Sequence, residues 1–146
     1  MQRFFRAAGQ KNLTPHVGEL ARLLHTTIAE CQREPAGSAG RAAEKYQACC
    51  VRKDSVTVTA EEGREQYYIN TSGSSALATA GSGDVLAGIT GAFAAKRQCE
   101  KMRKNQLAKT AALAAYAHGK AGEAAEEKSS ASYVTASEII RGLQSI

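Results

Sequence analysis

The chain has 146 residues, of which 43% are hydrophobic and 23% are charged, values ordinary for a single globular domain with a modest core. Its formal net charge is +5, but aromatic residues make up only 5% and tryptophan is absent, so we expect no nucleic-acid partner that stacks on aromatic side chains. No uninterrupted apolar run approaches roughly 18 residues, so we expect no membrane span.

The first residues and the cysteines bear on location. The start, MQRFFRAAGQ, has no long apolar core and makes a poor secretory signal, while an amphipathic organellar presequence stays open. The cysteines show no CxxC spacing, so neither a zinc site nor a disulfide framework is indicated for Cys31, Cys49, Cys50 and Cys99. Free thiols are typical of a reducing compartment, and we expect a cytoplasmic protein.

Helical and strand patterns alternate along the first half of the chain. A short helical stripe is formed by Leu20, Leu23, Leu24 and Ile28. Proline, glycine and serine predict a loop over residues 35–40, followed by a short helix over residues 41–48. Alternating and β-branched residues then predict three strands, at residues 49–52, 56–60 and 66–70.

The second half is mostly helical in pattern. A loop at residues 71–75 leads to an apolar helix that begins near Asp84. We expect Asn105 to cap a long alanine-rich helix that runs to about Glu127, and Thr135 or Ser137 to open a last helix. The order of elements along the chain is helices, then strands, then helices. This order indicates part of an α/β layer in one domain over residues 1–146.

The most informative segment is residues 79–88, TAGSGDVLAG. A glycine-rich turn at a helix start points several backbone N–H groups at one place, at the positive end of the helix dipole, and so forms an anion cradle. Asp84 would repel that anion unless it has a separate task, such as taking a proton from a hydroxyl that attacks a phosphoryl group. The alternative is that Asp84 only caps the helix.

Five segments in one order resemble a known family. They are LTPHVGELARLL at residues 13–24, KDSVT at 53–57, NTSGSSALATAGSGDVLAG at 70–88, the alanine-rich residues 111–122, and residues 135–140. The pattern resembles the ADP/ATP-dependent NAD(P)H-hydrate dehydratases of the ribokinase-like superfamily, over residues 13–146. The resemblance implies an α/β fold, a partial ribokinase-like three-layer α/β/α domain.

The resemblance also implies a reaction and its reactants. The hydroxyl of NAD(P)H hydrate is phosphorylated by ADP or ATP, with Mg²⁺, and phosphate then leaves to restore the nicotinamide ring. No metal ligand among the side chains is implied. The alternatives that stay open are a ribokinase-like small-molecule kinase and a catalytically inactive nucleotide-binding module.

The residue roles follow from matching positions in the motifs. Asp84 is implied as the catalytic base and, with His16, as a substrate contact. The implied nucleotide contacts are Lys53, Asp54, Ser55, Val56, Thr57 and Gly83, and the implied anion hole is Gly81, Ser82 and Gly83. His118 we interpret as a helix-packing residue, and Glu19 as a first-turn helix charge.

Three residues depart from the family pattern. Ala80 stands where the pattern has glycine, and if that position needs a positive φ its methyl group costs roughly 1–2 kcal/mol. Asp54 also replaces a glycine and puts a negative charge near the expected phosphates, and Val17 replaces a proline. The family's catalytic domains are nearly twice this length, so we expect the C-terminal part of such a domain, with the N-terminal part absent. A free strand edge would then favour a homo-oligomer.

Overall fold

The computed structural model describes residues 11–99, 107–129 and 133–146. A four-stranded sheet has the order β1-β2-β3-β4, in which β1 and β2 are parallel and the other neighbours antiparallel. The strands are β1 (Asn12–Leu13), β2 (Cys49–Arg52), β3 (Thr57–Glu61) and β4 (Tyr68–Asn70). The three predicted strands are therefore confirmed, each within two residues of its expected start.

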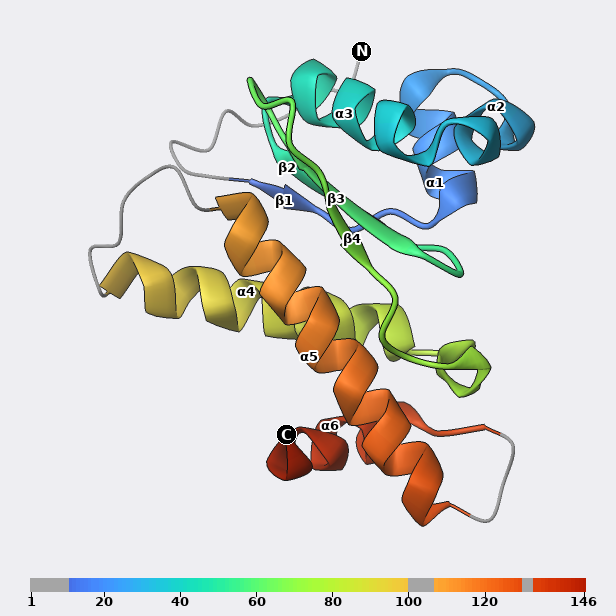
Figure 1. The fold of residues 1–146 in the computed structure, drawn as a ribbon, viewed down its shortest axis with the longest axis vertical. Coiled ribbons are helices and arrows are strands. Elements are labelled where there is room, and N and C mark those ends of the chain that lie inside the picture. The colour runs from blue at the N-terminus through green and yellow to red at the C-terminus, as the bar shows by residue number, and fades with distance from the viewer. Residues whose placement is uncertain (1–10, 100–106, 130–132) are drawn as a thin grey trace.

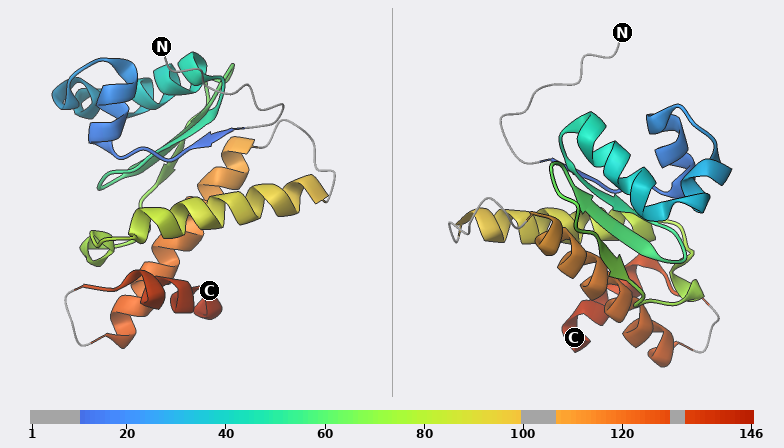
Figure 2. Two further views of the ribbon diagram at one scale, coloured as in Figure 1. Left: turned by 180° about the vertical axis from the view of Figure 1, so that it is seen from behind. Right: turned by 45° about the horizontal axis from the view of Figure 1, so that its top comes forward.

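Helices cover both faces of this sheet, which gives the expected three-layer arrangement (Figure 1). One layer contains α1 (Val17–Leu24), α2 (Ile28–Arg33) and α3 (Pro35–Tyr46). The other contains α4 (Ser82–Cys99) and α5 (Leu107–Lys128), with α6 (Ala136–Gly142) packed against α5. Both views in Figure 2 keep α1–α3 on one side of the sheet and α4–α6 on the other. Short 3₁₀ turns are η1 (Ser75–Leu77) and η3 (Leu143–Ser145).

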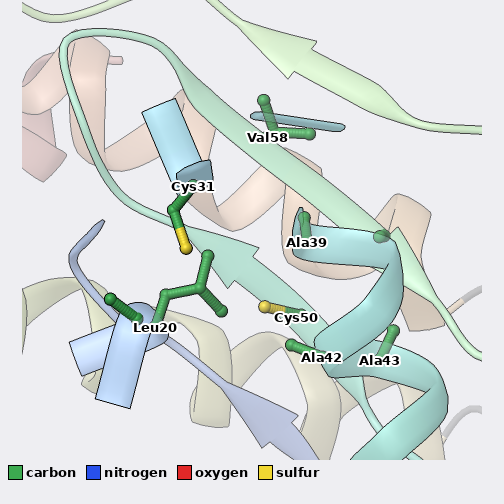
Figure 3. Packing of buried hydrophobic residues seen from close by; sticks show 9 residues of the cluster. Leu20, Cys31, Ala39, Ala42, Ala43, Cys50 and Val58 are labelled. Carbon is green, nitrogen blue, oxygen red and sulfur yellow. The ribbon is translucent and has the colours of Figure 1, made fainter. Parts of the chain in front are cut away.

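The strand β2 divides the core because its side chains alternate between the two faces. Cys50 packs with Leu20, Cys31 and the alanines of α3 (Figure 3), whereas Cys49 and Val51 pack with Leu86 and the first turns of α5. Burial raises the pKa of the Cys50 thiol to about 12 and raises the pKa of Cys49 as well. These thiols act as small hydrophobic groups rather than as nucleophiles.

The loop predicted at residues 35–40 is wrong, because α3 begins at Pro35. Proline fits the first helical position, where its missing N–H would have no partner in the helix. The Ser38 hydroxyl donates to the carbonyls of Cys31 and Pro35, and it is fully buried. The small residues that resembled a loop pattern instead let α3 lie close to the sheet.

The second helical layer matches the pattern with small shifts. Thr135 caps α6 through a capping box with Glu138, as one of the two expected alternatives. The cap proposed at Asn105 lies outside the described residues. Within the described ranges, no helix is long and apolar enough to cross a membrane.

Candidate active site

The glycine-rich turn precedes α4, as the sequence predicts. Gly81 has a φ of 82°, a left-handed conformation that favours glycine, and its carbonyl accepts from the amides of Asp84 and Val85 at 3.1 and 3.0 Å. The amide of Ser82 donates to the Thr79 carbonyl at 3.3 Å. In the described structure no hydrogen-bond partner occupies the amides of Gly81 and Gly83, so both can donate to an anion.

Ala80 does not carry the strain that its replacement of glycine suggested. Gly81, and not Ala80, has the positive φ in this turn. A Cβ atom placed on Gly81 would lie 3.1 Å from the Cβ of Ala136, at the start of α6. The turn therefore needs glycine at position 81 and tolerates alanine at position 80.

Lys53 brings two distant segments to the cradle. Its backbone N–H donates to the Pro15 carbonyl at 2.8 Å, and it forms a parallel bridge with His16. A Cβ atom placed on Gly83 would lie 2.9 Å from the Lys53 Nζ atom, so the ammonium group lies over Gly83. The structure thus brings together His16, Lys53 and Gly83 from three of the motifs.

Asp84 lies inside the first turn of α4, which begins at Ser82, so the alternative that it caps the helix is wrong. Its side chain is exposed, and its carboxylate has no hydrogen bond or ion pair to any described residue. It borders a hollow of about 560 Å³ that is otherwise apolar and includes Val85, Ile140 and Leu143. A carboxylate free of local partners beside an anion cradle can serve as a proton acceptor.

His16 caps α1, a role that the sequence analysis missed. Its Nδ1 atom accepts from the amides of Gly18 and Glu19 at 3.0 and 3.3 Å, and the Glu19 carboxylate accepts from the His16 amide at 2.8 Å. The signal was an HxxE spacing, the same spacing as a capping box. Because Nδ1 accepts, the ring proton is on Nε2, which lies 3.6 Å from the Glu19 Oε1 atom. The His16 side chain is half-exposed, so Nε2 can also donate to a ligand.

The other predicted nucleotide contacts form the turn between β2 and β3. Asp54 pairs with the buried Arg52 guanidinium at 2.9 Å and accepts from the Ser55 amide at 2.9 Å, so its charge is compensated locally. Asp54, Ser55 and Val56 border a second hollow of about 550 Å³, next to α2 and α3. Thr57 opens β3 opposite Asn70. Lys53 therefore contacts the cradle, whereas the three residues after it line a different hollow.

His118 is buried on α5, as its interpretation as a packing residue requires. Its Nε2 atom also lies 3.2 Å from the Ser82 hydroxyl, directly at the first residue of α4. Burial lowers the pKa of His118, a hydrogen bond to the Ser82 backbone partly opposes this, and the nearby Lys53 charge lowers the pKa further. His118 lies within the alanine-rich residues 111–122 that resemble the family, but sequence spacing alone did not place it next to Ser82.

Comparisons with known proteins agree with this arrangement. A family model described as NAD(P)H-hydrate dehydratase matches residues 2–145, almost the whole chain. The chain belongs to the NAD(P)H-hydrate dehydratase family. It is also similar to the bifunctional NAD(P)H-hydrate repair enzyme Nnr of Moorella thermoacetica, with 46% identity over 114 residues, which are 77% of this chain and 20% of that protein.

Solved structures of a dehydratase and of a ribokinase-like protein share the fold. The ADP/ATP-dependent NAD(P)H-hydrate dehydratase from Bacillus subtilis, co-crystallized with ATP/Mg²⁺, superposes with a TM-score of 0.80 at 29% identity, over 99% of this chain and 49% of that one. A ribokinase-like superfamily protein from Enterococcus faecalis gives 0.70 at 28% identity, over 92% of this chain and 42% of that one. The expected ribokinase-like fold is thus confirmed, and the chain spans about half the length of the B. subtilis structure.

Proposed function

We propose that this chain forms the nucleotide side of an ADP- or ATP-dependent NAD(P)H-hydrate dehydratase, a carbon–oxygen lyase that repairs the hydrated cofactor. The observation that carries the proposal is the meeting of Lys53 with Gly83 beside the exposed Asp84. The family match and the B. subtilis structure co-crystallized with ATP/Mg²⁺ support it. Phosphoryl transfer needs positioning, charge neutralisation and a base for the attacking hydroxyl, and these residues can supply all three.

Each residue would have a distinct task. The amides of Gly81 and Gly83, with the Lys53 ammonium, would neutralise the oxygens of the transferred phosphoryl group. Asp84 would accept the proton of the hydrate hydroxyl, and His16 would donate from Nε2 to the hydrate. Residues 54–57 would contact the nucleotide beyond its phosphates.

Magnesium fits this site as a partner of the nucleotide. The described residues include no group of three or more His, Cys, Asp or Glu side chains that could hold a metal. Mg²⁺ usually keeps several waters and is bound through substrate phosphates, so the phosphates of the nucleotide would hold the ion here and Asp84 would stay free as the base. When bound, the ion would neutralise charge on the phosphate oxygens.

We also propose a cytoplasmic location.

We further propose that the chain self-associates through β4. This strand is at one end of the described sheet, and the exposed fractions of Tyr68 and Ile69 are 37% and 66%. An exposed edge of this kind can pair with a second copy. Size-exclusion chromatography with light scattering would show a dimer, and a concentration-independent monomer would contradict the proposal.

The function is tested by incubating the chain with NADPH hydrate and ADP or ATP. Turnover is measured as the return of the absorbance of the reduced nicotinamide ring. Loss of a general base typically costs about 10²–10⁴ in rate, so we expect Asp84→Asn to lower turnover by that factor while ADP affinity stays within a few-fold. Nucleotide binding without turnover by the unaltered chain would identify an inactive module. Phosphorylation of other small alcohols in place of the hydrate would identify a kinase.

A further inference from the structure

His118 is a buried titratable residue that contacts the cradle and that the proposed reaction does not use. It lies on α5 with an exposed fraction of 9%, and its Nε2 atom is 3.2 Å from the hydroxyl of Ser82, which is itself 6% exposed. The contact joins two helices, because Ser82 is the first residue of α4.

Ser82 is held from two directions. Its amide donates to the Thr79 carbonyl, and its hydroxyl pairs with the His118 ring. The residues on either side, Gly81 and Gly83, carry the amides that are open to an anion. Because glycines are conformationally free, the direction of these amides depends on how firmly Ser82 is held.

The chemistry of the ring suits a fixed contact. Burial lowers the pKa of His118, and the neighbouring Lys53 ammonium lowers it too, so the ring is neutral near pH 7. A neutral ring keeps one donor and one acceptor nitrogen. It contributes one directed hydrogen bond to Ser82.

We propose that His118 is a positioning residue of the nucleotide site, which acts through Ser82 to hold the Gly81 and Gly83 amides in the geometry that receives phosphate oxygens. This inference rests on the proposed function. It assigns to α5 a part in binding, although none of its side chains was predicted to touch a ligand.

The test is calorimetric titration of ADP, and of inorganic pyrophosphate, into the unaltered chain and four variants. The variants are His118→Leu, His118→Gln, Ser82→Ala and the double variant His118→Leu/Ser82→Ala. Leucine fills the buried volume without a hydrogen bond, whereas the glutamine side-chain nitrogen reaches about as far as Nε2. Thermal melting of every variant reports whether the fold is kept.

We expect His118→Leu to lower the affinity for ADP and for pyrophosphate about tenfold, which corresponds to about 1.4 kcal/mol of binding free energy. His118→Gln should restore most of this affinity, and the double variant should bind no more weakly than Ser82→Ala alone. Packing alone would not produce either result.

The outcomes separate the two proposals. If the unaltered chain binds ADP but leucine and glutamine at position 118 have the same effect, or if the effects at 82 and 118 add, the positioning role is overturned and the nucleotide site stands. If the unaltered chain binds neither ADP nor pyrophosphate, the proposed function fails and this inference fails with it.

Discussion

The two helical layers cover the same sheet but pack differently. In the upper layer of Figure 1, α1 and α2 each begin with a capping box, His16 with Glu19 and Thr27 with Glu30, and no described glycine there approaches a neighbouring backbone closely. In the lower layer α6 also begins with a capping box, but here two backbone segments come very close at glycines. A Cβ atom on Gly119 would lie 2.7 Å from the Ser72 backbone carbon, and one on Gly142 would lie 2.2 Å from the Ala121 carbonyl oxygen.

This difference explains where the site is. The cradle belongs to the lower layer, where a Cβ atom on Gly81 or Gly83 would meet the side chain of Ala136 or Lys53. The upper layer contributes His16 at a helix start, and the end of β2 contributes Lys53. Phosphate binding by backbone amides needs a close approach of the ligand, and the missing side chains of Gly81 and Gly83 allow it.

The largest stability effect that we expect is at Gly119. An alanine there meets the Ser72 backbone, which has no flexible end to move away, so Gly119→Ala should destabilise the fold by about 3 kcal/mol, the upper end of overpacking costs. Gly91→Ala on α4 is the matched control, because a Cβ atom there meets nothing within 4 Å. It should stabilise by about 0.5–1 kcal/mol. Urea unfolding measures both, and an equal effect at the two positions would contradict the comparison.

A smaller effect on stability is expected at Asp54, in the turn between β2 and β3. Asp54→Gly restores the family's residue but leaves the Arg52 guanidinium, 2% exposed, without its carboxylate. We expect a loss of about 2 kcal/mol, less than for a fully buried pair because Asp54 is 30% exposed.

The double variant Arg52→Met/Asp54→Gly is the control for this pair. Replacing a buried ion pair by apolar groups is often close to neutral, so the double variant should recover most of the lost stability. A double variant less stable than Asp54→Gly would show that Arg52 is needed for another reason.

The smallest effect concerns pH. Because the pKa of His118 is lowered in the folded chain, the unfolded chain binds more protons, and the unfolding free energy falls as the pH drops through about 6.5, the ordinary histidine value. Thermal melting between pH 7.5 and 5.5 should show a decrease that is reduced in His118→Gln and unchanged in His25→Asn. The lowered pKa values of Glu30, Glu123 and Glu138 affect stability only at more acidic pH. An identical decrease in all three proteins would rule out His118.

Local signals predicted much of the fold. The β-branched run predicted β3, the glycine-rich turn predicted the start of α4, and Thr135, one of the two expected caps, begins α6. The loop at residues 35–40 was wrong because the pattern of small residues does not distinguish a loop from a helix packed closely on a sheet.

The site was predicted less completely, for a physical reason. The Arg52–Asp54 pair could have been suspected from opposite charges two residues apart, but the burial of Arg52 could not. The contact between Ser82 and His118 joins residues 36 positions apart, and that between Lys53 and Gly83 joins residues 30 apart. Such contacts follow from how the layers meet, which no local pattern records.

The most direct test of the central claim is calorimetric titration of ADP into the unaltered chain, Gly81→Ala and Ala80→Gly. If the amides around Gly81 receive the phosphates, the unaltered chain binds ADP at one saturable site. Gly81→Ala should then bind about tenfold more weakly, because alanine disfavours a φ of 82° by roughly 1–2 kcal/mol and the free turn relaxes out of the geometry that the ligand needs. Ala80→Gly should bind equally well. No saturable binding by the unaltered chain, or equal binding by Gly81→Ala, would contradict the account.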